Sequence, residues 1–540
     1  MPASHHFRTR ALAGLLALSL SFTAPATALA QVRLPALGDA SSDDFSLSAE
    51  RRIGEQIMRE IRRDPDYLDD PMLLEYVQSL WSPLLAAARK RGDIGPDVDA
   101  GFAWEAFLVR ERSVNAFALP GGYVGVHLGL IAMTARSDEL AAVLAHELSH
   151  ISQRHIARSI ASSSRQSLVG MAAIILGILA ASRSKSPDMA NAVVAGGQAA
   201  MIQGQLNFSR DMEREADRIG FGVMSGAGFA PSGVARMFEK LENANRLNDS
   251  GAFPYLRSHP LTTERIGEAR ARAEAVPAGD PRAALQPGLE HAAMQGRARV
   301  LMDSSAQALR RFQLGEAALQ GSTAERLTGL YAGALASILL REPARADSAI
   351  ASARTLLAAQ TPRDARAERA LALLQVQALA ERGDAARALA AIDAPPGDSA
   401  ALKDNSRVVL LARAQAALAV ARAGGNAAAL RSSTEALQTH VAERPNDAAA
   451  WSALAQGAEH LGLKLRALRA QAESHAAIGD LVGAIDRLRA GQRAARAGSP
   501  DFIEASIIDS RLRELQTQRR QELADARNER GGSSREPPQE

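Results

Sequence analysis

Hydrophobic positions in the first half of the chain follow a helical period, change to a strand period and then return to a helical one. Residues 46–64 and 70–91 place apolar side chains three or four positions apart, which predicts two amphipathic helices. Residues 101–110 alternate between apolar and polar side chains as a strand does. Residues 113–131 form two such runs around a Pro-Gly-Gly turn at 120–122, which predicts a hairpin.

Two more helical patterns follow the strands, at 137–160 and 210–229. Between them, residues 168–181 form a strongly apolar stretch, "LVGMAAIILGILAA". A bilayer span needs roughly 20 apolar residues, so this stretch is short for a transmembrane helix. It predicts a buried or partner-facing helix, with peripheral contact to a membrane surface as the alternative.

The second half of the chain is a series of Ala-rich helical patterns that begins after the Pro- and Gly-containing segment 275–288. Short breaks at Gly383, Gly425, Gly462 and Gly479 divide these patterns. The last two glycines lie about half a tetratricopeptide period apart, since that helical hairpin repeats every 34 residues or so. A tetratricopeptide-like solenoid is therefore predicted, and another kind of α-helical solenoid is the alternative.

The N-terminus has the three parts of a secretory signal peptide. Arg8 and Arg10 supply the positive region, residues 11–22 are apolar, and "ALA" ends at Ala30 with small residues in the cleavage positions. Cleavage after Ala30 would make Gln31 the first residue of the mature protein. An uncleaved membrane anchor is the weaker alternative, because the apolar run is shorter than a bilayer span.

The amino-acid composition restricts the cellular compartments and the classes of partner that are expected for this protein. The 540 residues contain no cysteine, which excludes disulfides and thiolate metal sites. An exported chain without cysteine is typical of the bacterial periplasm, where the environment is oxidising. The formal net charge is only +3 and part of it belongs to the signal peptide, so a nucleic-acid partner is not expected.

The chemistry of the chain is concentrated in "HELSH", residues 146–150. On a helix, His146 and His150 are about one turn apart, so their imidazoles project from one face and can bind a single Zn²⁺. Glu147 lies beside this pair and is suited to act as the general base on a zinc-bound water. His155 would be rotated about 140° from His150 on a continuous helix, so it is predicted to be structural or to support a ligand.

A third ligand must come from another part of the chain, and the acidic segment "DMEREAD" at 211–217 offers it. Glu213 and Asp217 share one helical face, whereas Glu215 points away from it. Glu213 is therefore predicted to be the carboxylate ligand. Asp217 would accept the outer N–H of a ligand histidine and fix its tautomer.

Four stretches together carry a resemblance to a known family: "HELSHISQRHIAR", "NAFALPGG", "RDMEREADRIG" and "SHPLTTERI". They resemble the bacterial branch of the gluzincin metallopeptidases, which includes the CAAX prenyl proteases and the heat-shock membrane protease. Within it, the chain is similar to exported periplasmic members with C-terminal tetratricopeptide-like repeats. The resemblance implies one Zn²⁺ per chain bound by His146, His150 and Glu213, with Glu147 as the catalytic glutamate.

The resemblance also completes the predicted architecture. The fold class is mostly α, with a zincin-type α+β metalloprotease domain that holds a small β-sheet, followed by an all-α tetratricopeptide-like solenoid. The predicted divisions are a signal peptide at 1–30, the protease domain at 31–274, a linker at 275–300, the repeats at 301–497, and a terminal helix with a disordered tail at 498–540.

The role of His259 has two alternatives. The resemblance implies that it stabilises the oxyanion of the tetrahedral intermediate. A neutral imidazole on a loop could instead occupy the open position of the zinc and keep the enzyme latent. An extended substrate could pair with the strand at 115–119, which makes Asn115 and Phe117 candidate substrate-binding residues.

The predicted function is that of a periplasmic zinc endopeptidase with possible chaperone activity, acting in the assembly and quality control of outer-membrane proteins. By resemblance, its partners are unfolded or misassembled outer-membrane proteins and the barrel-assembly machinery. The alternative is a chaperone or scaffold that works through its helical repeats and has a latent or structural zinc site.

Overall fold

The computed structural model describes residues 46–162, 209–247, 254–275, 288–313, 321–393, 402, 404–496 and 501–532. Three predictions fall outside these residues and stay predictions. They are the signal peptide with its cleavage after Ala30, the apolar segment 168–181, and the disordered tail beyond residue 532.

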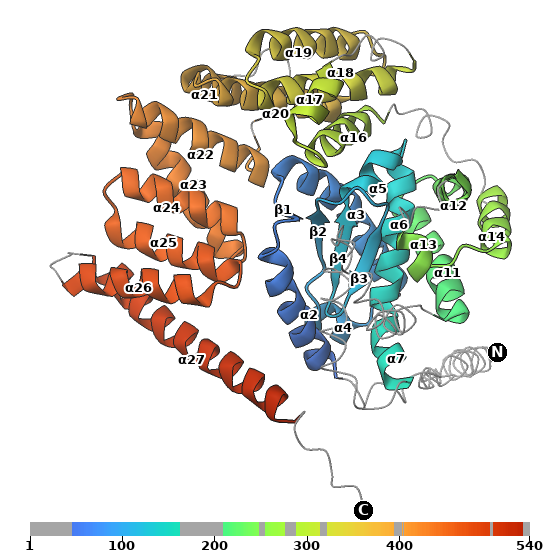
Figure 1. Ribbon diagram of the computed structural model, residues 1–540, viewed down its shortest axis with the longest axis horizontal. Helices are drawn as coiled ribbons and strands as arrows, with labels where there is room; N and C mark the ends of the chain where they lie inside the picture. Colours follow the sequence, from blue (N-terminus) through green and yellow to red (C-terminus); the bar gives the residue numbers. More distant parts are fainter. Residues whose placement is uncertain are drawn as a thin grey trace, which may run out of the picture. The chain divides into compact units, whose positions relative to one another are not determined.

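A four-stranded sheet forms the centre of the N-terminal half, as the strand patterns predicted (Figure 1). The strand order is β1-β2-β4-β3, with β2 parallel to β4 and the other two pairs antiparallel. Among the residues that the structure describes, strand β3 pairs with β4 alone and lies at the edge of the sheet. The strands are β1 (Tyr67–Leu68), β2 (Glu105–Val109), β3 (Ala116–Leu119) and β4 (Tyr123–His127).

The turn between β3 and β4 depends on its two glycines. Gly121 and Gly122 have φ angles of 76° and 92°, in the left-handed region that side chains disfavour. A Cβ at Gly122 would also lie 2.8 Å from the Phe102 side chain. The turn sets the register in which Phe117 lies opposite Gly125, and this register fixes which groups of β3 face the outer edge.

Helices cover both faces of the sheet, which explains why every residue of β4 is buried. Ile57 and Met58 of helix α2 pack with Phe107 of β2 on one face. Leu108 of β2 and Val124 of β4 face a larger core that includes α3 and α6. The helices of this half are α2 (Leu47–Arg62), α3 (Pro71–Arg91), α4 (Pro96–Gly101), α5 (Leu128–Met133), α6 (Ser137–Ser152), α7 (His155–Ser162), α11 (Arg210–Gly226), α12 (Ser232–Leu247), α13 (Pro254–Ser258) and α14 (Thr263–Ala275).

The prediction of one continuous helix over 137–160 is wrong, because this segment forms two helices with a break between them. Helix α6 ends at Ser152 and α7 begins at His155. Between them Arg154 has a φ angle of 53°, which a continuous α-helix cannot contain. Apolar spacing could not reveal the break, since the pattern continues through it on both sides.

The linker predicted at 275–300 needs a correction. Residues Leu289–Leu301 form helix α16, which is buried along most of its length and contacts α5 of the first half and α18 of the second. Only the segment up to residue 288 has the Pro/Gly composition of a linker. The Ala-rich sequence after it forms a helix because both of its sides find apolar partners.

The C-terminal half is entirely helical over its described residues, which confirms the predicted fold class. Figure 1 shows successive helices from α18 onward lying beside their neighbours in chain order. Helix α20 ends at Glu381 and α21 begins at Ala385, so the predicted break at Gly383 separates them. The helices are α17 (Ala306–Gln313), α18 (Thr323–Leu339), α19 (Pro343–Ala358), α20 (Ala365–Glu381), α21 (Ala385–Asp393), α22 (Arg407–Arg422), α23 (Ala428–Glu443), α24 (Ala448–His460), α25 (Lys464–Ala477), α26 (Leu481–Arg496) and α27 (Phe502–Gly532).

Among the residues described here, none of the helices combines the length and the apolar character that crossing a membrane requires.

Candidate active site

Helix α6 carries the two histidines of the "HELSH" motif into the interior. Its residues from Asp138 to Ser152 are all buried, between the edge strand β3 on one side and α11 on the other. His146 Nε2 and His150 Nε2 lie 3.0 Å apart. The predicted geometry, in which both imidazoles project from one face of the helix, is therefore present.

Helix α11 brings Glu213 to this pair from 63 residues further along the chain. Glu213 Oε2 lies 3.5 Å from His146 Nε2, and Glu213 Oε1 lies 3.5 Å from His150 Nε2. The approach depends on Gly220, where a Cβ would lie 3.1 Å from the backbone of Ala145 and His146. Glycine at this position therefore allows the close approach of α11 to α6, since a Cβ would make a tight contact there.

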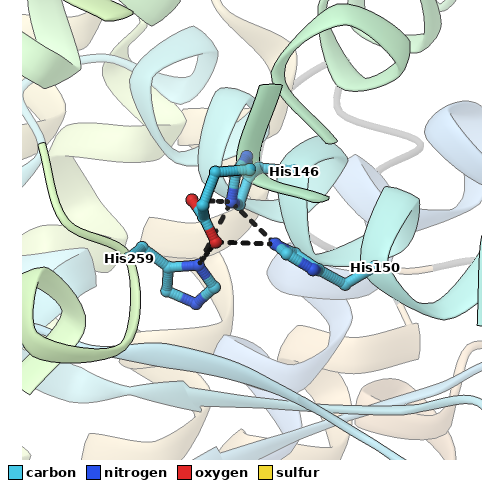
Figure 2. A group of neighbouring side chains, drawn as sticks. His146, His150 and His259 are labelled. Atoms are coloured by element: carbon cyan, nitrogen blue, oxygen red, sulfur yellow. Dashed lines mark hydrogen bonds and ion pairs between the residues drawn. The ribbon is translucent and has the colours of Figure 1, made fainter. Parts of the chain in front are cut away.

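His259 completes the group from the turn that follows α13. Its Nδ1 lies 2.8 Å from Glu213 Oε1 and 3.3 Å from His146 Nε2. In Figure 2 the rings of His146, His150 and His259 point toward one another. All four residues are buried, and each contributes one ligand atom to a set whose members lie within 4.8 Å of one another.

This donor set fits one tetrahedral divalent cation. Four ligands at about 2.0–2.1 Å from a common ion would lie about 3.3 Å from one another. Contacts between donor atoms of these residues run from 2.8 to 3.5 Å when the nearer oxygen of Glu213 is taken for each contact. One ligand atom from each of the four residues lies within 4.8 Å of the others. Imidazole nitrogens with a carboxylate oxygen are also the ligands that zinc prefers among the common biological cations.

Glu147 lies beside the donor group without being part of it. Its side chain is 0% exposed, and its Oε2 accepts a hydrogen bond of 3.0 Å from the backbone N–H of Ala118 in β3. Its Oε1 lies 3.5 Å from His259 Nε2. Burial raises the pKa of the Glu147 carboxyl above its usual value, which suits a group that must take up and release a proton.

Asp217 contacts the His146 ring on the side that faces away from the donor group. Its Oδ1 lies 3.0 Å from His146 Nδ1, the nitrogen that faces away from the donor group. Burial by itself lowers the pKa of His146, but hydrogen bonds to Asp217 and Glu213 outweigh burial and raise this pKa to about 10. Two carboxylates thus increase the electron density that the ring offers to a cation.

Arg265 lies in the site, although the sequence patterns did not predict it there. Its Nε and Nη2 donate to both oxygens of Asp217 at 2.6 and 2.8 Å, and its Nη1 lies 2.9 Å from Glu213 Oε2. The same Nη1 donates to the carbonyl oxygen of Pro260, directly after His259. The stretch "SHPLTTERI" contains this arginine six residues after His259, and this proximity in the sequence was the signal that could have indicated it.

The structure places His155 behind His150, on the side of that ring that faces away from the donor group. His155 Nδ1 lies 2.8 Å from His150 Nδ1, and His155 Nε2 lies 3.0 Å from Glu215 Oε2. Burial lowers the pKa of His155 to about 4, so the ring is neutral near pH 7. Glu215 is outside the donor group, as its position on α11 predicted.

Asn115 and Phe117 lie at the edge strand but outside the donor group. The carbonyl oxygen of Asn115 accepts a hydrogen bond from the backbone N–H of His127. The ring of Phe117 packs edge-on against Phe107 and His127, with centroids 5.9 and 5.8 Å away. Both residues thus have structural contacts, and their role toward a substrate stays a prediction.

Metal removal is expected to destabilise the fold, because four buried donor groups would lose their common partner. A ligand present at about 1,000 times its Kd contributes about 4 kcal/mol to stability. A strong chelator should therefore lower the melting temperature, and added Zn²⁺ should restore it. A His146→Ala variant should melt at the same temperature with and without chelator. Equal melting of the wild-type chain in both conditions would contradict a bound metal.

Comparisons with known proteins agree with this geometry. Residues 87–273 match the model of peptidase family M48. The chain is 32% identical to the beta-barrel assembly-enhancing protease of Escherichia coli over 259 residues. This match covers 48% of this chain and 51% of that protein. The protein of the same name from Yersinia pestis is 29% identical over 489 residues, covering 90% and 92%.

The chain is also similar to a mitochondrial protease over less than half of its length. The mitochondrial metalloendopeptidase OMA1 of Schizosaccharomyces pombe is 32% identical over 224 residues, 42% of this chain and 61% of that protein. The matches at 30% identity or more described here span between half and two thirds of the relatives' own lengths. The family model spans residues 87–273, which include all four residues of the donor group, and this agrees with the family resemblance carried by the sequence motifs.

Proposed function

We propose that this chain is a zinc-dependent endopeptidase of peptidase family M48, whose model matches residues 87–273, and that it acts in the assembly and quality control of outer-membrane proteins in the periplasm. The observation that carries the proposal is the convergence of His146, His150 and Glu213 beside a buried glutamate that is not itself a ligand. A purely structural zinc site would not need this glutamate.

The residues of the chain can be assigned to the steps of peptide hydrolysis. His146, His150 and Glu213 would hold the zinc, and Asp217 would orient His146. The bound ion supplies a water of lowered pKa and polarises the scissile carbonyl. Glu147 takes a proton from the attacking water and returns it to the leaving amine, a task that its raised pKa favours.

The edge strand β3 is suited to hold an extended substrate. Within the described part of the chain β3 is an edge strand, to which a peptide can add through main-chain hydrogen bonds. The Ala118 N–H on this edge already contacts Glu147, so a peptide bound there would lie next to the general base. Main-chain pairing of this kind requires an unfolded segment but no particular sequence, which suits a quality-control protease.

We assign His259 the role of a latch on the zinc. Its Nδ1 lies in the donor group, 2.8 Å from Glu213 Oε1 and 3.3 Å from His146 Nε2, so it could serve as a fourth ligand in place of water. The residue follows a short helix that is joined to the rest of the site through Arg265 and Pro260. Movement of this turn would free the fourth position for water and substrate.

A His259→Ala variant is therefore expected to hydrolyse casein faster than the wild-type chain. If the latched state holds about nine tenths of the molecules, removing it raises the rate about tenfold. Initial rates at equal zinc content give the measurement. A fall in rate would instead assign His259 to oxyanion stabilisation, and an unchanged rate would leave it a structural histidine.

Digestion assays test the proposed activity directly. The purified protein is expected to cleave casein, to lose this activity with a chelator and to regain it with Zn²⁺. An unfolded outer-membrane β-barrel protein should be cleaved faster than an unfolded soluble protein of similar length. Failure to cleave any unfolded protein would overturn the peptidase, and equal rates would overturn only the preference for outer-membrane substrates.

The helical repeats are proposed to recruit substrates and the barrel-assembly machinery, as the names of the bacterial relatives suggest. Stacked hairpins give an extended surface on which an unfolded segment can bind. Chaperone activity would use the same surface without cleavage. The protein recovered from a periplasmic extract is expected to begin at Gln31, which N-terminal sequencing would show.

A further inference from the structure

His150 differs from His146 in what supports its outer nitrogen. His150 Nε2 faces the donor group, 3.5 Å from Glu213 Oε1. On the opposite side of the ring, His150 Nδ1 lies 2.8 Å from His155 Nδ1. His155 Nε2 in turn lies 3.0 Å from Glu215 Oε2. A second imidazole thus stands between the ligand histidine and the carboxylate, where His146 contacts Asp217 directly.

Only one arrangement of protons allows all these contacts at once when His150 binds a cation. The lone pair of His150 must be on Nε2, so its proton is on Nδ1 and is donated to His155 Nδ1. His155 Nδ1 then carries a lone pair, which places the His155 proton on Nε2. This proton points to a carboxylate oxygen of Glu215, which can only accept. His150 therefore donates to His155, and His155 donates to Glu215; these three groups form a hydrogen-bonded relay in which every bond has a defined donor.

The break in the helix creates this relay. A straight continuation of α6 would turn His155 about 140° away from the face of His150. Arg154 instead adopts a φ of 53°, a left-handed conformation that is strained for a residue with a side chain. Its Nε lies 3.0 Å from Glu50 Oε2 of α2, and Glu50 is only 2% exposed. This buried ion pair holds the strained residue in place.

We propose that His155 and Glu215 are positioning residues for the metal site, which fix the tautomer and the ring orientation of His150. This inference rests on the metal site of the proposed function. Glu215 is 29% exposed and also accepts a hydrogen bond of 2.8 Å from Arg158 of α7. The relay therefore ties α7 to α11 and ends near the surface of the protein.

The test measures zinc affinity by competition with a chromophoric chelator, in the full-length chain. Groups that orient a metal ligand typically contribute about 10- to 100-fold to affinity. A His155→Leu variant, which fills the space without polar atoms, is expected to bind zinc weaker by that factor. A His155→Gln variant keeps an acceptor for His150 and a donor for Glu215, so it should recover most of the affinity.

His291→Leu serves as the matched control. His291 is equally buried, and its Nε2 lies 2.8 Å from the carbonyl oxygen of Thr134, away from the donor group. This variant should bind zinc within about twofold of the wild-type chain. Zinc affinity of His155→Leu at the wild-type level would overturn the proposal. An equal loss in His155→Gln and His155→Leu would also overturn it, because packing would then explain the effect.

Glu215→Ala keeps the test informative should the buried variants fail to fold, because Glu215 is partly exposed. It is expected to weaken zinc binding and to change the visible absorption spectrum of the Co²⁺-substituted protein, which reports the ligand geometry. An unchanged affinity and spectrum would remove Glu215 from the relay. A wild-type chain that binds no zinc would refute the proposed function itself, which keeps the two failures distinguishable.

Discussion

Replacement of Glu147 by glutamine is expected to lower the kcat for casein hydrolysis by about 100- to 10,000-fold, the range that a positioned general base contributes. Glutamine has the same shape, but it cannot take a proton from water. The carboxylate does not belong to the donor group, so zinc content and melting temperature should stay close to those of the wild-type chain. Steady-state kinetics together with metal analysis give the measurement.

Glu139→Gln provides the control on the same helix. Glu139 is also buried, but its Oε2 accepts a hydrogen bond from Lys240 of α12 and does not face the donor group. Its variant should keep the turnover rate per folded molecule. Complementation in cells separates the two candidate functions. If Glu147→Gln fully replaced the wild-type chain there, the chaperone or scaffold function would be favoured over the protease.

A second large effect is expected at Arg297, which joins the catalytic half of the chain to its helical repeats. Arg297 of α16 donates from Nε and Nη2 to both oxygens of Asp70 at 2.8 and 2.7 Å, and from Nη1 to Gln377 of α20 at 3.1 Å. The side chains of Asp70 and Arg297 are 9% and 6% exposed. Arg297→Met would leave a buried carboxylate without its counter-ion and should cost about 3–5 kcal/mol of unfolding free energy.

Chemical denaturation would measure the loss of unfolding free energy in Arg297→Met and in two comparison variants. Arg89→Met breaks the more exposed pair with Asp99 and should cost no more than about 1 kcal/mol. Asp70 also caps helix α3 through the Leu73 N–H, a task that serine can perform. Arg297→Met combined with Asp70→Ser should therefore be more stable than Arg297→Met alone. A double variant that is no better would contradict the unpaired charge as the cause.

Local sequence patterns were sufficient for much of the fold. The hairpin around residues 120–122, the small sheet and the all-helical second half follow from side-chain periods and turn residues that depend on near neighbours. They failed where a single backbone conformation matters, as at Arg154, whose strain is maintained by a buried glutamate about a hundred residues earlier. Local patterns also failed to predict that residues 289–301 form helix α16, because its burial depends on helices from both halves of the chain.

The sequence by itself determined the chemistry of this protein. The spacing of His146, Glu147 and His150 fixes two imidazoles and an acid on one turn of helix, because covalent geometry leaves a helix no other arrangement. Only the tertiary structure decided what surrounds them. It brought His259 into the donor group and Arg265 into contact with the carboxylates of Glu213 and Asp217. It also placed His155 beside the outer nitrogen of His150. These contacts join different helices or cross a break between them, so their distances depend on how the helices pack.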